Sequence, residues 1–107
     1  MSVRPDPAGK PRLLMTYVAP FGSAVVARSA RAPEGPWSAP VDVAQCALDP
    51  TVPGAFCGGG QQHPELTAPA GRLVVSYDAR TFATDAGTNA QGFWPHLAVV
   101  DVPAALP

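Results

Sequence analysis

The sequence predicts an all-β protein that forms part of a β-propeller, with about two blades of antiparallel strands. One strand unit occurs twice, as Arg12–Val18 (RLLMTYV) and sixty positions later as Arg72–Asp78 (RLVVSYD). Repetition of short strand units between turn-rich segments is typical of radial β arrays. The 14 prolines and 10 glycines exclude long helices. A closed ring of blades needs on the order of 200 residues, and this chain has 107.

The first predicted blade, the penultimate one of the ring, covers residues 12–43. Residues 1–11 are proline-rich and are expected to be loose. Arg12–Ala19 is apolar on both faces, which suits a strand between neighbouring blades. After a short turn, Ser23–Ala30 is predicted to be its antiparallel hairpin partner. Pro40–Val43 then forms a short outer strand.

A long irregular crossover loop is predicted at 44–62, because it holds both cysteines and three consecutive glycines. The last blade, 63–103, is predicted from three strands, which are His63–Leu66, Arg72–Asp78 and Trp94–Asp101. Residues 104–107 are expected to be a tail.

Cys46 and Cys57 are the two cysteines of the chain, and neither belongs to a C-x-x-C pair. A disulfide between them would close a loop rich in proline and glycine. It would stabilise the fold by about 2–3 kcal/mol and indicate an oxidising compartment. The alternative is two unrelated buried thiols. The start lacks the apolar region of a signal peptide, so we expect a secreted or envelope-exterior parent protein whose exported N-terminal portion lies outside this chain.

Charge and motifs exclude several functional classes. Seven basic residues stand against eight acidic ones, without a basic cluster, which argues against a nucleic-acid partner. No apolar run approaches the ~18 residues of a membrane span. Phosphate-loop, serine-hydrolase and zinc-protease motifs are absent from the sequence.

Two stretches resemble known propeller proteins. Ser29–Trp37 resembles the strand-end turn of five-bladed propeller glycosidases. Phe56–Leu66, followed by Gly71–Tyr77, resembles the C-terminal blade of a bacterial secreted family catalogued as a domain of unknown function, some members of which are endo-D-arabinanases. The resemblance covers most of residues 12–103. It implies a five-bladed propeller and a glycoside hydrolase acting on arabinan-type polysaccharide.

Glycoside hydrolysis takes two carboxyl groups, one protonated and one ionised. The candidate carboxyl groups in this chain are those of Asp49, Glu65, Asp78 and Asp85. The resemblance implies that the main acids come from earlier blades. We therefore assign no catalytic residue and expect the isolated chain to be inactive.

His63 and Glu65 are two residues apart, so on a strand they project to the same face. In related arabinanase propellers a last-blade histidine serves a central metal, which makes His63 a candidate for a calcium ion or a bound water. Gln62 joins this set as a channel residue. The alternative is that His63 hydrogen-bonds the cysteine loop while Glu65 caps backbone amides.

Asp78 and Arg80 are candidate substrate contacts, although related proteins often place Asn near the position of Arg80. The alternative for them is an ion pair at the strand end. Trp94 is expected to pack as a plug or to stack on a sugar, and His96 has no assigned role.

Two other functions compete with the hydrolase. One is a non-catalytic glycan-binding or interaction module, and the other is a truncated reading frame without independent function. The expected partners are polysaccharide and either the missing N-terminal blades or a second copy, because an incomplete ring exposes sheet faces and strand edges.

Overall fold

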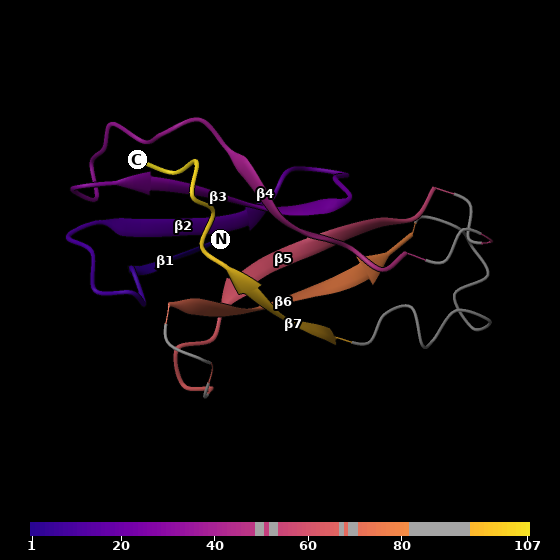
Figure 1. The fold of residues 1–107 in the computed structure, drawn as a ribbon. Helices are drawn as coiled ribbons and strands as arrows, with labels where there is room; N and C mark the ends of the chain where they lie inside the picture. Colours follow the sequence, from indigo (N-terminus) through magenta and orange to yellow (C-terminus); the bar gives the residue numbers. More distant parts are fainter. Residues whose placement is uncertain (49–50, 52–53, 67, 69–70, 82–94) are drawn as a thin grey trace.

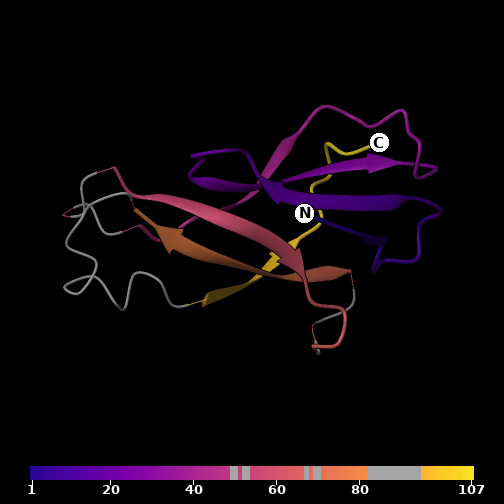
Figure 2. The same ribbon diagram turned by 180° about the vertical axis from the view of Figure 1, so that it is seen from behind.

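The computed structural model describes residues 1–48, 51, 54–66, 68, 71–81 and 95–107. Its strands are β1 (Ser2–Pro5), β2 (Leu13–Val18), β3 (Ala24–Ala30), β4 (Val41–Gln45), β5 (Phe56–Gln62), β6 (Arg72–Arg80) and β7 (Pro95–Asp101). They form two antiparallel sheets that lie against each other (Figures 1 and 2). The all-β prediction is confirmed. Nowhere in these ranges is there a helix long and apolar enough to cross a membrane.

The first sheet has four strands in the order β1-β2-β3-β4. β2 and β3 form the predicted hairpin, with Leu13 opposite Ala30 and Val18 opposite Val25. The connecting turn places Phe21 at a φ of 58°, a left-handed conformation that few non-glycine residues adopt. β4 agrees closely with the predicted outer strand at Pro40–Val43. Its pairing with β3 changes register between Val25 and Val26 of β3.

The second sheet has three strands in the order β5-β6-β7. β6 is central and is the second copy of the repeated strand. Gly59 and Gly60 have φ values of 91° and 80° and lie where the β5–β6 register shifts, as is usual for a bulge that needs glycine. A Cβ on Gly60 would stand 2.7 Å from Tyr17 Cα. The two sheets therefore approach most closely where β5 crosses β2.

Three segments differ from the sequence prediction. The start, expected to be loose, contains β1, because the edge of β2 offers it a ladder of main-chain partners. The expected crossover loop contains β5, whose glycines allow a strand to lie directly on β2. His63–Leu66, expected to be a strand, is a turn closed by a hydrogen bond from Leu66 N to His63 O of 3.1 Å.

The C-terminal segment is held against the first sheet rather than forming a free tail (Figure 1). Leu106 is buried in the core. The Arg12 guanidinium donates to the main-chain oxygens of Leu106 and Pro107 at 2.8 and 2.7 Å. Arg12 also pairs with Asp6 at 2.6 Å, with both side chains nearly inaccessible to solvent. This one arginine thus ties the β1–β2 connection to the end of the chain.

The core lies between the two sheets. Its buried apolar side chains are Leu14, Val25, Ala27, Cys57, Leu73, Val75, Tyr77 and Leu106. Cys46 and Cys57 form a disulfide, which confirms that prediction. The bond joins the chain just after β4 to β5, so it links one sheet to the other.

The two copies of the repeated strand bury opposite faces. In β6 the odd-numbered Leu73, Val75 and Tyr77 point into the core. In β2 the core positions are the even-numbered Leu14 and Val18. The two copies are offset by sixty positions, which is an even number. An odd-numbered residue of β2 therefore corresponds to an odd-numbered residue of β6. The core-facing side of β6 is therefore equivalent to the outward side of β2. We call this arrangement front-to-back stacking, because the two repeated units meet through non-equivalent faces.

Candidate functional site

The predicted site residues lie at opposite ends of the β5–β6 hairpin. Gln62 is the last residue of β5, with His63 and Glu65 in the turn after it, whereas Asp78 and Arg80 lie at the end of β6. The His63 N–H donates to Val74 O at 2.8 Å, so His63 is level with Val74. Asp78 is four residues further along β6, which is about 13 Å at the rise of a strand. The structure therefore separates the predicted set into two groups.

His63 is the centre of a hydrogen-bonded chain. Its Nδ1 lies 2.7 Å from Glu65 Oε1 and its Nε2 lies 2.6 Å from Ser76 Oγ. A carboxylate only accepts, so Nδ1 donates to Glu65; when the ring carries this one proton, Nε2 accepts the Ser76 hydroxyl. The hydrogen bond from His63 holds the pKa of Glu65 below its usual range. The Glu65 carboxylate also accepts a hydrogen bond from its own main-chain N–H, which lowers its pKa further, as the alternative of backbone capping predicts. The His63 ring nitrogens bond Glu65 and Ser76 and not the cysteine loop.

The order Ser76, His63, Glu65 matches that of a nucleophile, its base and an orienting carboxylate. Acyl transfer also needs main-chain N–H groups that point at the developing oxyanion. Ser76 is in the middle of the central strand, paired with Gln61 on one side and Leu97 on the other. The N–H groups around it serve the two ladders. The chain of hydrogen bonds therefore fixes the His63 ring rather than building an acyl-transfer site.

The residues near His63 do not fit the metal that the resemblance implies. Both ring nitrogens of His63 already have partners. In the described part of the chain, His, Cys, Asp and Glu residues form no group of three that could hold an ion. We derive no chemistry through a metal at this position.

Gln62 is buried and belongs to the contact between the sheets. Its Nε2 donates to Ser2 O at 3.2 Å and to Leu14 O at 3.0 Å. These two bonds tie β5 to β1 and β2. A cavity of about 450 Å³ lies beside Gln62 and His63, bounded by β1 and by the turn that follows β5.

Asp78 and Arg80 form a two-point ion pair on the outward side of the second sheet. Arg80 Nε lies 2.6 Å from Asp78 Oδ1, and Arg80 Nη2 lies 3.1 Å from Oδ2. This contact raises the pKa of Arg80, which stays charged at every physiological pH. A Cβ on Gly58 would stand 2.6 Å from the guanidinium carbon. Gly58 therefore allows Arg80 to lie across β5.

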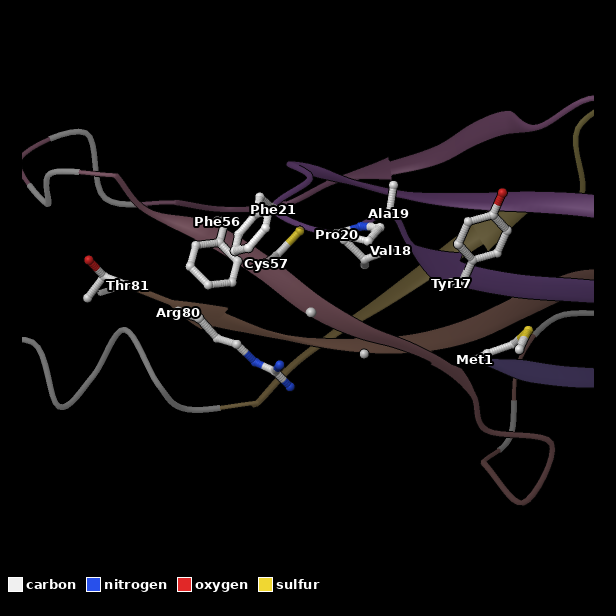
Figure 3. A pocket seen from close by; sticks show the side chains of 12 residues that line it. Met1, Tyr17, Val18, Ala19, Pro20, Phe21, Phe56, Cys57, Arg80 and Thr81 are labelled. Atoms are coloured by element: carbon white, nitrogen blue, oxygen red, sulfur yellow. The ribbon is translucent and has the colours of Figure 1, made fainter. Parts of the chain in front are cut away.

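Arg80 borders a cleft that we call the aromatic cleft (Figure 3). It has a volume of about 830 Å³ and is lined by Met1, Tyr17, Val18, Ala19, Pro20, Phe21, Phe56, Cys57, Gly58, Gly59, Arg80 and Thr81. Phe21 is 69% exposed, and its ring meets that of Phe56 edge-on at 5.3 Å. The Cys57 N–H donates to Gly22 O at 2.9 Å, which holds the hairpin tip against β5.

Sequence reasoning missed the aromatic members of this cleft. The sequence places Phe21 in the short turn after Arg12–Ala19 and Phe56 within the predicted crossover loop at 44–62, and it predicts no site role for either ring. The available signal was a large apolar residue at a hairpin tip, where a side chain has no core to enter. The pairing of Phe56 with Arg80 in the β5–β6 register has no counterpart in the linear sequence.

The remaining candidates have no place in either group. His96 is half-buried opposite Tyr77 in the β6–β7 register and stacks on its ring, with centroids 5.1 Å apart. The Tyr77 hydroxyl in turn accepts the Ala47 N–H at 2.8 Å. Asp49, Asp85 and Trp94 lie outside the described residues.

Comparisons with profiles of known protein families, with curated proteins and with solved structures found no match to this chain.

Proposed function

We propose that this chain is the C-terminal portion of a secreted carbohydrate-active propeller protein and binds arabinan-type polysaccharide without hydrolysing it alone. The observation that carries the proposal is the aromatic cleft. Exposed aromatic rings stack on the apolar face of a sugar, and a fixed arginine donates hydrogen bonds to its hydroxyls and ring oxygen. Phe21 supplies the ring, and Asp78 holds Arg80 in place.

Front-to-back stacking supports the propeller part of the proposal. In a sandwich of two repeated sheets, equivalent faces would meet in the core. Here the odd face of β6 meets the even face of β2, which is the relation expected between successive blades. The disulfide supports an oxidising compartment, as secretion requires.

The electrostatics support binding without hydrolysis. A glycosidase needs one carboxyl group that is protonated near neutral pH, which requires a raised pKa. The pKa of Glu65 is lowered by His63. Asp78 is engaged in its ion pair with Arg80. Neither carboxylate is in an environment that suits a general acid, in agreement with the expectation that the main acids come from other blades.

The test is binding of purified arabinan by isothermal titration calorimetry. Phe21→Asn removes the ring, and Asn tolerates the positive φ of this position. Stacking energies of about 0.5–1.5 kcal/mol predict a loss of affinity of roughly two- to twelvefold. Arg80→Gln is expected to weaken binding further because it removes a charged donor.

Leu97→Ala is the matched control, because Leu97 is exposed but lies outside the cleft. It should bind arabinan as the wild type does. Absence of wild-type binding, or equal binding by Phe21→Asn, would disprove the proposal. Release of reducing sugar that Glu65→Gln abolishes would show that the essential acids are in this chain after all.

A further inference from the structure

The outward side of the second sheet carries an apolar strip whose β7 side chains are exposed, whereas its β6 member Val74 is buried. We call it the docking face and define it as Val74, Ser76, Leu97 and Val99. Leu97 is 62% exposed and Val99 is 51% exposed. They are opposite Ser76 and Val74 in the β6–β7 register, so the four side chains share one side of the sheet.

The first sheet already shows what covers such a face. Ser76 is equivalent to Thr16, and Val74 to Leu14. Thr16 and Leu14 are fully buried under the second sheet and the C-terminal segment. The docking face is thus the repeat counterpart of a surface that is buried in the fold.

The complementary surface is the outward side of the first sheet. There Leu13, Met15 and Tyr17 correspond to Leu73, Val75 and Tyr77, which fill the core from the second sheet. The three outward residues are half-buried and stand outside the core cluster. The chain therefore carries both halves of one stacking interface, one on each outer side.

Arg28 belongs to the same outward side as these residues. It is opposite Met15 on the outward side of the first sheet. Its Nε is buried and, among the described residues, has no hydrogen-bond partner. A buried donor without an acceptor is costly.

We infer that a second copy of this chain docks head to tail, the outward side of its first sheet covering the docking face. The contact repeats the stacking between the two sheets of one chain, so it is heterologous and leaves a free docking face on the added copy. The inference rests on the front-to-back stacking and not on glycan binding.

Two variants block one side each. Leu97→Lys/Val99→Lys puts charge on the docking face, at positions where the exposed wild-type side chains leave room. Val3→Lys/Met15→Lys charges the complementary side, because Val3 is opposite Met15 and is 42% exposed. Sedimentation velocity over a range of concentrations measures the association of each protein, alone and mixed.

The wild type is expected to associate with rising concentration, and each variant alone should remain a monomer. An equimolar mixture of the two variants should form a one-to-one complex and nothing larger, because each supplies the surface that the other lacks. Circular dichroism checks folding. If a lysine variant fails to fold, Leu97→Ala/Val99→Ala and Val3→Ala/Met15→Ala replace the pair, with weakened association as the expected result.

A wild type that stays monomeric at all concentrations would overturn the inference. So would a dimer of Val3→Lys/Met15→Lys alone, which would show a symmetric contact through the second sheet, or a mixture that forms no complex. Phe21→Asn should associate like the wild type, and Leu97→Lys/Val99→Lys should retain arabinan binding. Failure of this inference and failure of the proposed function are therefore separable.

Discussion

The two repeated units place an equivalent hydroxyl side chain in different surroundings. Thr16 in β2 and Ser76 in β6 are equivalent positions. The Thr16 hydroxyl is completely buried and donates to Gly60 O at 2.6 Å across the contact between the sheets. The Ser76 hydroxyl is half-buried and bonds His63 in the turn that follows β5. The repeated sequence therefore determines that both segments are strands. The side on which the other sheet packs determines the hydrogen-bond partner of the equivalent hydroxyl.

The repeated arginines differ in the same way. Arg12 pairs with Asp6 where the two side chains are 8% and 0% exposed. Arg72, its equivalent, pairs with Asp101 where they are 46% and 78% exposed. Exposed pairs contribute little to stability because water and ions screen them. A buried carboxylate that loses its partner is strongly destabilising.

Replacing these arginines gives the largest expected contrast. Arg12→Ala leaves Asp6 buried without its charge partner and frees the C-terminal segment, so we expect a loss of about 3–5 kcal/mol. Arg72→Ala should cost at most about 1 kcal/mol. Urea denaturation of both variants measures the difference. Equal losses in the free energy of unfolding would show that the two ion pairs stabilise the fold to the same extent.

Two glycines test how closely the units approach. Gly9 and Gly60 share a φ of 80°, but a Cβ on Gly9 meets nothing within 4 Å, whereas one on Gly60 meets the Tyr17 backbone. Gly9→Ala should cost roughly 1 kcal/mol for its backbone conformation. Gly60→Ala adds overpacking, for a total of about 3 kcal/mol. Similar melting temperatures for the two variants would contradict the close contact of β5 with β2.

The equivalent hydroxyls are expected to differ by less. Thr16→Val keeps the side-chain shape but leaves the buried Gly60 carbonyl without its donor, which should cost about 1–3 kcal/mol. Ser76→Ala removes a half-buried bond and should cost about 0.5 kcal/mol. Chemical denaturation is again the measurement. A greater loss for Ser76→Ala would mean that the His63 chain, and not the contact between the sheets, stabilises the fold.

Local pattern predicted the strands that bury their own apolar residues. β2, β3, β6 and β7 follow from runs of large apolar residues between turns. β1 and β5 do not, because one contains proline and the other three glycines. Their strand conformation depends on partners distant in the sequence, such as β2 for β1. The disulfide was predictable because Cys46 and Cys57 are the two cysteines of the chain.

The candidate site was predictable only where its contacts are local. The closeness of His63 to Glu65 and of Asp78 to Arg80 follows from their spacing of two residues. The contact of His63 with Ser76 depends on the β5–β6 register, which the sequence does not reveal. The aromatic cleft joins Phe21 to Phe56 through the packing of a hairpin tip against another sheet, and no linear motif encodes that contact.

The smallest expected effect concerns the carboxylate of Glu65, which has no counterpart in the first unit. Because His63 lowers the pKa of Glu65, the folded protein releases this proton more readily than the unfolded chain. The resulting stabilisation is present above the ordinary glutamate pKa of about 4.3 and is lost as the pH falls through the lowered value. Glu65→Gln should therefore reduce the melting temperature slightly at pH 6 and flatten its decline at acid pH.

Glu34→Gln is the matched control, since it also removes one carboxylate but in the exposed turn before Trp37. Melting temperatures of the wild type and both variants between pH 3 and pH 7 isolate the effect of the His63 contact. We expect the acid part of the curve to change more in Glu65→Gln than in Glu34→Gln. Identical curves for the two variants would mean that the His63–Glu65 pair, in which the Glu65 side chain is exposed, contributes nothing to the second unit beyond fixing the orientation of the imidazole ring.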